Sequence, residues 1–135
     1  MGKYMLIVVA ALIKKEDKIL LARRSTGDAS VLGKWEFPGG KLNSGETEEQ
    51  AIEREIYEEF ELKVKATKFL THTIYTDLLK TIDLKLYECQ YLDGQICLHD
   101  HYEYQWVTKK DLLQFDLAPA DLFLVNSIME YEDVL

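Results

Sequence analysis

Three glutamates with helical spacing are the residues of this sequence best suited to chemistry. Glu55, Glu58 and Glu59 lie at positions i, i+3 and i+4, so on a helix their side chains fall within about 100° of one another. Carboxylate oxygens at this spacing suit Mg²⁺ or Mn²⁺, whereas without an ion the like charges destabilise a helix. The pattern predicts a divalent-metal site, and a solvated acidic helix face is the alternative.

The segment around these glutamates carries its own helix signals. Thr47 and Gln50 form a capping box that opens a helix. The apolar residues Ile52, Ile56 and Phe60 share one arc, which should face a core. The helix is predicted to end at about Phe60, with the glutamates on the arc beside the core.

The rest of the chain alternates strand patterns with turn signals and ends in helical patterns. Polar clusters with Gly or Asn, such as residues 25–34 and 43–45, predict loops. One helix among mixed strands and another at the end predict an α/β fold in which helices cover a mixed sheet. The expected strands are 4–13, 18–22, 35–37, 64–73, 82–91 and 105–107, and the other expected helical segments are 109–114 and 120–131.

Size and charge limit the possible partners. The chain has 135 residues and a formal net charge of −8, which predicts a single domain over residues 1–135 and no binding to a nucleic-acid polymer. Small polyphosphates are also acidic, so they would bind together with cations that a carboxylate cluster can hold. The apolar run near the start is too short for a membrane span and lacks a signal-peptide cleavage site. A cytoplasmic protein without a membrane partner is expected.

The thiol and imidazole groups show no familiar metal-binding spacing. Cys89 and Cys97 match no common motif, and both are predicted to be inert thiols in the core. His72, His99 and His101 have no zinc spacing with these cysteines. The sequence assigns the histidines no role.

A longer pattern surrounds the glutamates and resembles the Nudix box. It consists of Gly40, five residues, Glu46, seven residues, Arg54-Glu55-Ile56-Tyr57-Glu58-Glu59 and then Leu62. The family usually has Gly where this chain has Glu61, at a helix end where a left-handed turn is common. Segments 20–24 and 36–41 are similar to MutT-like members, and segment 118–121 to their CTP pyrophosphohydrolase-like branch. The resemblance implies an α/β/α sandwich with the box as loop, helix and loop.

The resemblance also implies a set of metal ligands. In the family the box glutamates hold Mg²⁺, and Mn²⁺ can substitute. The carbonyl of the first glycine of the Gly-Gly pair and an acidic residue in a loop before a Trp-Val strand often complete the set. The ligands implied here are Glu55, Glu58, Glu59, the Gly39 carbonyl and Glu103, with Asp100 as the second candidate for the last position.

The implied reaction is attack of water at the β-phosphorus of a nucleoside triphosphate, giving a nucleoside monophosphate and pyrophosphate. Metal ions neutralise phosphate charge and lower the pKa of bound water, and a carboxylate takes the proton. Glu55, Glu58 and Glu103 are all candidates for this base. Arg54 is implied to brace neighbouring carboxylates and can reach Glu58 one turn away, while Glu46 is implied to be structural.

The implied substrate contacts lie outside the helix. Arg23, Arg24 and Lys41 are candidates for gripping the polyphosphate, and Arg24 matches the MutT-like pattern better than Arg23. Asp121 matches the position that reads the base in MutT-like enzymes. An ionised Asp only accepts hydrogen bonds, which predicts a donor-rich base edge such as that of cytosine or 8-oxoguanine. Its alternative role is to cap the last helix near its N-terminus.

The implied function is hydrolysis of a CTP-like or 8-oxo-dGTP-like nucleotide, in the second case to sanitise the nucleotide pool. An alternative is hydrolysis of another nucleoside diphosphate derivative, such as ADP-ribose, a nucleotide sugar or a dinucleoside polyphosphate. A different class is an inactive nucleotide-binding module, but such modules usually lose a box glutamate and all three are present here. A capped-RNA-binding domain is disfavoured by the negative charge. The family contains monomers and homodimers, and both remain open.

Overall fold

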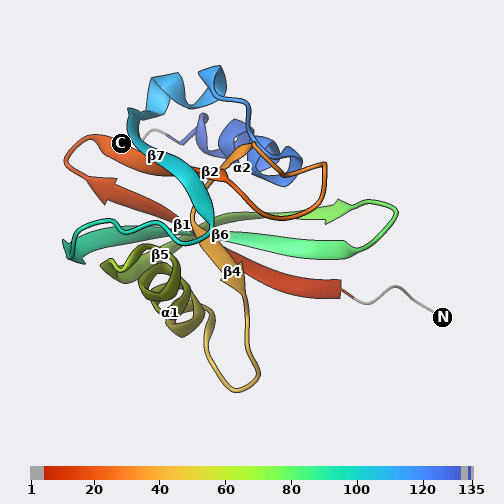
Figure 1. Ribbon diagram of the computed structural model, residues 1–135, viewed down its shortest axis with the longest axis horizontal. Helices are drawn as coiled ribbons and strands as arrows, with labels where there is room; N and C mark the ends of the chain where they lie inside the picture. Colours follow the sequence, from red (N-terminus) through yellow and green to blue (C-terminus); the bar gives the residue numbers. More distant parts are fainter. Residues whose placement is uncertain (1–4, 132–133, 135) are drawn as a thin grey trace.

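The computed structural model describes residues 5–131 and residue 134, and a mixed seven-stranded sheet runs through its centre (Figure 1). The middle strand is β1 (Met5–Lys15), which pairs in parallel with β6 (Thr81–Asp93). The other edge of β6 pairs antiparallel with β5 (Lys63–Thr76). The strands expected at 64–73 and 82–91 are therefore present and longer than predicted. Tyr4, the expected first residue of β1, lies outside the described residues.

The opposite edge of β1 is shared by two strands. β2 (Lys18–Arg24) pairs with β1 only beside the turn that joins them, and then pairs with β7 (His101–Thr108) and β3 (Trp35–Glu36). The short strand β4 (Gly39–Lys41) pairs instead with residues 8–10 of β1. The corner between β3 and β4 therefore lies where the two halves of the sheet diverge.

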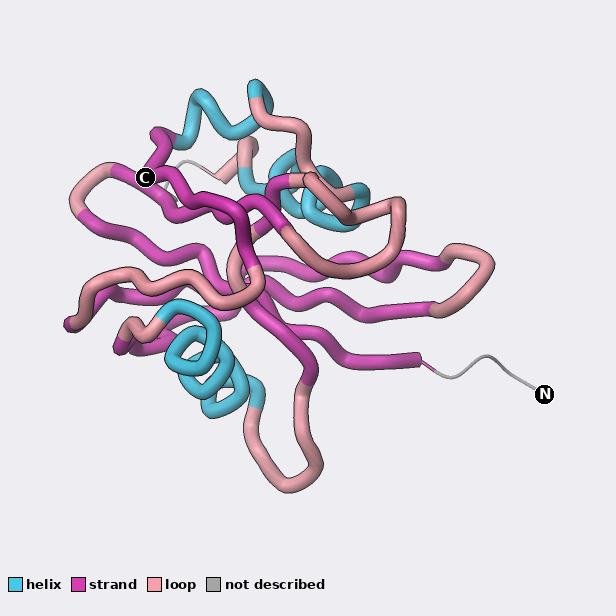
Figure 2. Tube along the Cα trace, in the orientation of Figure 1, coloured by secondary structure: helices cyan, strands magenta, loops and turns pink. Residues whose placement is uncertain are grey.

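Helices cover both faces of the sheet (Figure 2). α1 (Glu48–Phe60) packs on one face and α2 (Pro119–Ile128) on the other, with the 3₁₀ helix η1 (Lys109–Gln114) beside α2. Alternate side chains of β1 supply both cores, because successive residues of a strand point to opposite faces. The predicted α/β fold is confirmed. The core under α1 includes Val9, Ala11, Ile13, Ile52, Ile56 and Phe60, and the core under α2 includes Ala10, Leu12, Leu124 and Val125.

No helix within the described part of the chain is long and apolar enough to cross a membrane.

Strand β4 was not predicted, because Pro38-Gly39-Gly40 looked like a turn that ends β3. Gly39 instead lies opposite Ala10 in the sheet. A Cβ at Gly39 would collide with the carbonyl oxygen of Val9, so the close approach of these two backbones requires glycine. The glycine that suggested a turn is thus what allows a strand to pack there.

Two other element predictions need correction. β7 begins at His101 rather than at residue 105, because its first half pairs with β2 over a range that includes Ala22↔Tyr104 and Arg24↔His101. Alternating polar and aromatic residues gave little strand signal there. Residues 109–114 form a 3₁₀ helix instead of an α-helix, which is common for short connecting segments.

The prediction for the cysteines is half wrong. Cys89 is fully buried, and burial raises the pKa of its thiol to about 12, as expected for an inert core residue. Cys97 is exposed. It lies on the connection between β6 and β7. Its two neighbours, Ile96 and Leu98, pack against the core, so the Cys97 side chain points to the opposite side.

Candidate active site

Helix α1 is fixed at both ends and along its apolar face. At its start, the Gln50 N–H donates to the Thr47 hydroxyl at 3.1 Å, and the Thr47 N–H donates to the Gln50 side chain at 2.9 Å. The predicted capping box is therefore present. At its end Glu61 has a left-handed backbone with φ +57° and donates its N–H to the Tyr57 carbonyl at 2.9 Å. These constraints set the rotation of the helix and thus the direction of its glutamates.

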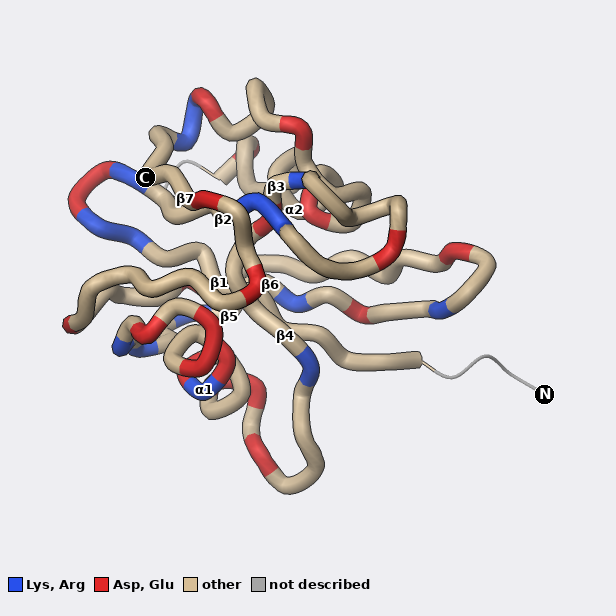
Figure 3. The backbone as a smooth tube through the Cα atoms, viewed as in Figure 1, with Lys and Arg blue, Asp and Glu red and all other residues tan. Residues whose placement is uncertain are grey.

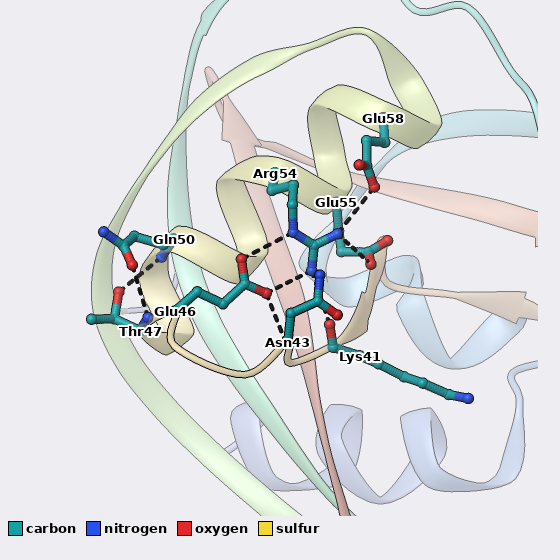
Figure 4. Close-up of polar contacts among 8 residues, drawn as sticks. All are labelled: Lys41, Asn43, Glu46, Thr47, Gln50, Arg54, Glu55 and Glu58. Atoms are coloured by element: carbon teal, nitrogen blue, oxygen red, sulfur yellow. Dashed lines mark hydrogen bonds and ion pairs between the residues drawn. The ribbon is translucent and has the colours of Figure 1, made fainter.

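Arg54 connects the carboxylates of this region (Figure 4). Its Nε and Nη2 donate to the two oxygens of Glu46 at 3.0 and 2.6 Å. Nη1 donates to Glu55 at 2.9 Å and to Glu58 at 3.0 Å, the contact predicted from the spacing. Nη2 also donates to the Lys41 carbonyl at 3.1 Å. One planar guanidinium thus ties α1 to the loop before it and to β4.

Glu55 is partly buried between α1 and β4. A Cβ on Gly40 would lie against this carboxylate, 2.7 Å from Oε1, so any larger residue at this position would force the Glu55 side chain to move. Burial raises the pKa of Glu55, and the negative charges of Glu58 and Glu46 add to this effect, whereas Arg54 opposes it. Glu55 is therefore held close to the β4 backbone in an environment that disfavours its charge.

Glu59 is the most strongly perturbed carboxylate on α1. Burial, followed by the negative charges of Glu55, Glu36 and Asp100, raises the pKa of Glu59 to about 8, while Arg24 opposes the shift. These groups come from α1, from β3, from the residue before β7 and from β2. Negative charge therefore converges from several elements on one small volume.

The carboxylates fit the hard divalent ion that the sequence pattern implies. Figure 3 shows acidic positions along α1 and in the loop before it. The raised pKa values of Glu55 and Glu59 show that the positive charge available nearby does not compensate their charges. A Mg²⁺ or Mn²⁺ ion would compensate them through the oxygen ligands it prefers.

The pKa of Glu59 predicts how stability depends on pH. A carboxyl whose pKa is raised from 4.5 to about 8 on folding stabilises the protein below pH 4.5, and this contribution is lost as the pH rises through 8. Without divalent ions, the free energy of unfolding should fall by about 1–3 kcal/mol between pH 5 and 8.5, allowing for partial solvent screening. Urea denaturation measures this.

The matched variant for this pH effect is Glu59→Gln, which cannot ionise. It should remove most of the loss of stability between pH 5 and 8.5. Mg²⁺ should also stabilise the unmodified protein more at pH 8.5 than at pH 5, because it binds the ionised form. If the free energy of unfolding of Glu59→Gln fell with pH as steeply as that of the unmodified protein, this account of Glu59 would be contradicted.

Replacing Arg54 with lysine should be destabilising despite the retained charge. A lysine ammonium cannot contact four groups in the planar arrangement seen here, and Glu46 and Glu55 would lose hydrogen bonds. We expect Arg54→Lys to lower the free energy of unfolding by about 1–3 kcal/mol. Arg23→Lys is the control, because Arg23 has an exposed carboxylate partner at 3.6 Å. Equal effects of the two substitutions in chemical denaturation would contradict this role of Arg54.

A pocket of about 180 Å³ opens beside the carboxylates. Its walls come from β1, the β3–β4 corner, the turn between β5 and β6, and the start of α2. Gly40 lines the pocket and also lies against Glu55, so the pocket and the acidic cluster meet at the β4 backbone. Arg24 and Asp121, two of the predicted substrate contacts, both line it.

Asp121 is 6% exposed and lies in the first turn of α2. Its carboxylate accepts the Phe37 N–H at 2.9 Å, which links the helix to the β3–β4 corner. The N-cap residue of α2 is Ala118 and no side-chain hydrogen bond caps the helix, so the described role of the Asp121 carboxylate is its contact with Phe37. Burial, and then the charge of Glu36, raises the pKa of Asp121 well above its ordinary value. A raised pKa favours the protonated form of Asp121, which donates one hydrogen bond as well as accepting them.

The sequence assigns no role to Glu36 or to His101. The two oxygens of Glu36 contact Arg24 Nη1 at 3.3 Å and His101 Nε2 at 2.9 Å. His101 is buried and lies against Phe60 with 4.9 Å between the ring centroids, so it is no exposed loop histidine. The only signal for such a role was the position of Glu36, a charged residue within an apolar strand and directly before Phe37 and Pro38.

Three predicted site residues point elsewhere. Arg23 donates through Nε to the Gly33 carbonyl at 3.1 Å and lies 3.6 Å from Glu103. Glu103 is in strand β7 rather than in the loop before it, whereas the charge of Asp100, the residue before β7, helps to raise the pKa of Glu59. The Lys41 side chain extends away from the Arg54 contacts in Figure 4. The geometry thus favours Asp100 and Arg24 over Glu103 and Arg23.

Comparison with known proteins identifies the family and the fold. The family model of the NUDIX domain matches residues 3–125. The CTP pyrophosphohydrolase of Escherichia coli is 33% identical over 125 residues, which cover 93% of this chain and 92% of that protein. The 8-oxo-dGTP diphosphatase of Buchnera aphidicola is 30% identical over 128 residues, 95% of each chain. The solution structure of the E. coli ORF135 protein is similar with a TM-score of 0.81 and 32% identity, covering 94% of this chain and 90% of that one.

A mixed sheet between helices, with a capped helix that presents three glutamates, defines a hydrolase of the Nudix type. The chain belongs to the Nudix hydrolase family. It is a MutT-like Nudix pyrophosphohydrolase, an enzyme that acts on acid anhydrides of phosphorus.

Proposed function

We propose that this enzyme hydrolyses a nucleoside triphosphate to the nucleoside monophosphate and pyrophosphate in the presence of Mg²⁺. The observation that carries the proposal is the pocket that places Asp121 and Arg24 beside Gly40, against which Glu55 lies. A nucleotide can extend from Asp121, at the base, to the carboxylates, at the phosphates. The relatives named for CTP and for 8-oxo-dGTP support a triphosphate as substrate.

In this proposal Glu55, Glu58 and Glu59 would hold the divalent ions, with the Gly39 carbonyl and Asp100 as further oxygen donors. Such ions neutralise phosphate charge and activate water when they are bound. Arg54 keeps Glu55 and Glu58 in place through its hydrogen bonds.

The proposed chemistry transfers the pyrophosphoryl group, made of the β- and γ-phosphates, to water. Water forms a bond to the β-phosphorus, and the bond from this phosphorus to the α–β bridging oxygen breaks. The monophosphate leaves with that oxygen, and the water proton passes to a carboxylate. We favour Glu55 for the base role, because its carboxylate lies against the pocket-lining Gly40.

The remaining pocket residues would select and orient the substrate. Arg24 carries positive charge at the pocket wall and can contact the polyphosphate. Asp121 would read a base edge with a hydrogen-bond donor, as in cytosine or 8-oxoguanine. Its raised pKa also allows the neutral acid to donate one hydrogen bond to the base. The small pocket and the net charge of −8 favour a free nucleotide over a nucleic-acid polymer.

A turnover panel with Mg²⁺ tests the substrate class. It contains the standard nucleoside and deoxynucleoside triphosphates, 8-oxo-dGTP, 5-methyl-dCTP, ADP-ribose and a dinucleoside polyphosphate. We expect the highest kcat/KM for a triphosphate with a cytosine-type or 8-oxoguanine-type base. Turnover restricted to ADP-ribose or the dinucleoside polyphosphate would refute the substrate class and leave the metal site standing.

A further inference from the structure

A second group of metal-ligating side chains lies on the surface at the C-terminal end of α1. Glu61, Cys97 and His99 place a carboxylate oxygen, a thiol sulfur and an imidazole nitrogen within 4.8 Å of one another. The His99 Nε2 is 2.8 Å from a Glu61 carboxylate oxygen. All three residues are exposed, and none of them belongs to the pocket or to the Arg54 network.

The fold holds the three side chains together through their backbones. The Cys97 N–H donates to the Phe60 carbonyl at 3.0 Å, which fastens the connection between β6 and β7 to the helix end. The partly buried Ile96 and Leu98 pack against the core. Because side chains alternate along an extended segment, Cys97 and His99 both point outward toward Glu61. The Cys-x-His spacing by itself is not a recognised metal-binding motif. The fold brings a third ligand, Glu61, to it from the C-terminal end of α1.

The electrostatics of the helix end also suit a cation. The carbonyl end of a helix carries partial negative charge that favours cations, and the last turn of α1, which is fully described, contains no basic residue. At Glu61, where the Nudix box usually has glycine, φ is +57°, a region that glycine adopts at lower cost. The exchange of glycine for glutamate adds a carboxylate at this point.

We propose that Glu61, Cys97 and His99 form a surface site for a zinc-class transition-metal ion, with water as the fourth ligand. Zinc has bond lengths of about 2.0–2.3 Å to oxygen, nitrogen and sulfur, so tetrahedral ligand atoms lie roughly 3.3–3.8 Å apart. The present separations, 2.8 Å between His99 and Glu61 and at most 4.8 Å between any two of the ligand atoms, bracket this range. Thiolate and imidazole ligands select zinc, cobalt or copper over Mg²⁺, so this site is chemically distinct from the glutamate cluster.

The site can be tested by titrating the reduced, metal-free protein with Co²⁺, the spectroscopic substitute for Zn²⁺, in excess Mg²⁺. A thiolate bound to Co²⁺ gives a charge-transfer absorption in the near ultraviolet, and Cys89 is buried, so the band reports Cys97. We expect one Co²⁺ equivalent to produce the band and Zn²⁺ to remove it by competition.

Variants separate this site from the catalytic one. Cys97→Ser should abolish the band, and His99→Ala and Glu61→Gly should each weaken Co²⁺ binding by more than about tenfold. Glu61→Gly should also raise the melting temperature of the metal-free protein, because it relieves the left-handed backbone. Glu58→Gln should leave the band unchanged.

His72→Ala is the matched control, since His72 forms an exposed contact with Asp83 at 2.8 Å and resembles the His99–Glu61 pair. It should leave Co²⁺ binding unchanged. A missing band in the unmodified protein would overturn the proposal, as would a band that survives Cys97→Ser or that responds equally to His72→Ala and His99→Ala.

Discussion

A Glu58→Gln variant is expected to fold normally and to lose about 10²–10⁴-fold in turnover with Mg²⁺. The Glu58 side chain is 57% exposed and its described partner is Arg54 at 3.0 Å. An uncharged amide of the same shape should therefore cost less than about 1 kcal/mol of stability. The amide cannot bind a divalent ion as a carboxylate does, so the loss should appear in kcat.

Glu49→Gln is the control for this experiment. Glu49 is an exposed glutamate in the first turn of the same helix. Glu49→Gln therefore changes the net charge of the protein by the same amount as Glu58→Gln. Its turnover should stay within about twofold of the unmodified enzyme, because exposed charges away from the site interact weakly. Near-normal turnover of folded Glu58→Gln would contradict its assignment as a metal ligand.

The second large effect is expected at Asp121. Asp121→Asn should change the ranking of bases by about 10–100-fold in kcat/KM, which corresponds to one hydrogen bond to a charged or strongly polar group. The reason is that an amide offers a fixed donor pair and one acceptor, whereas a carboxyl with a raised pKa can be an acceptor or can carry one proton. The dependence on Mg²⁺ should not change.

Asp116→Asn is the matched control for Asp121. Its carboxylate is exposed and contacts Lys34 at 2.9 Å on the surface. Kinetics with a cytosine, a guanine, an 8-oxoguanine and an adenine triphosphate compare the two variants. An unchanged base ranking in Asp121→Asn would leave Asp121 only the structural role of holding Phe37.

The sequence predicted well what depends on local spacing. The capping box at Thr47 and Gln50 and the contact between Arg54 and Glu58 are both present. Each of these features connects residues at most four positions apart, within one turn of helix. The α/β class followed from the same local signals, since each element reveals its own period.

Contacts between distant segments were not predictable in this way. His101 and Glu36 are 65 residues apart, and the pairing of both β7 and β3 with β2 brings them together. Glu103 had the right residue type for a ligand, but its strand register pairs it with Arg23. Cys97 was placed in the core by composition, although the alternation set by Ile96 and Leu98 turns it outward. Register and pairing, rather than residue type, decided these outcomes.

The identity of the products tests the central proposal most directly. The unmodified enzyme would be incubated with Mg²⁺ and its best triphosphate, and the reaction followed by phosphorus NMR. The proposed cleavage between the α- and β-phosphates predicts nucleoside monophosphate and pyrophosphate in equal amounts, and no signal from a nucleoside diphosphate. Release of inorganic phosphate and a nucleoside diphosphate would contradict the proposal, because the bond to the γ-phosphate would then be the one that breaks.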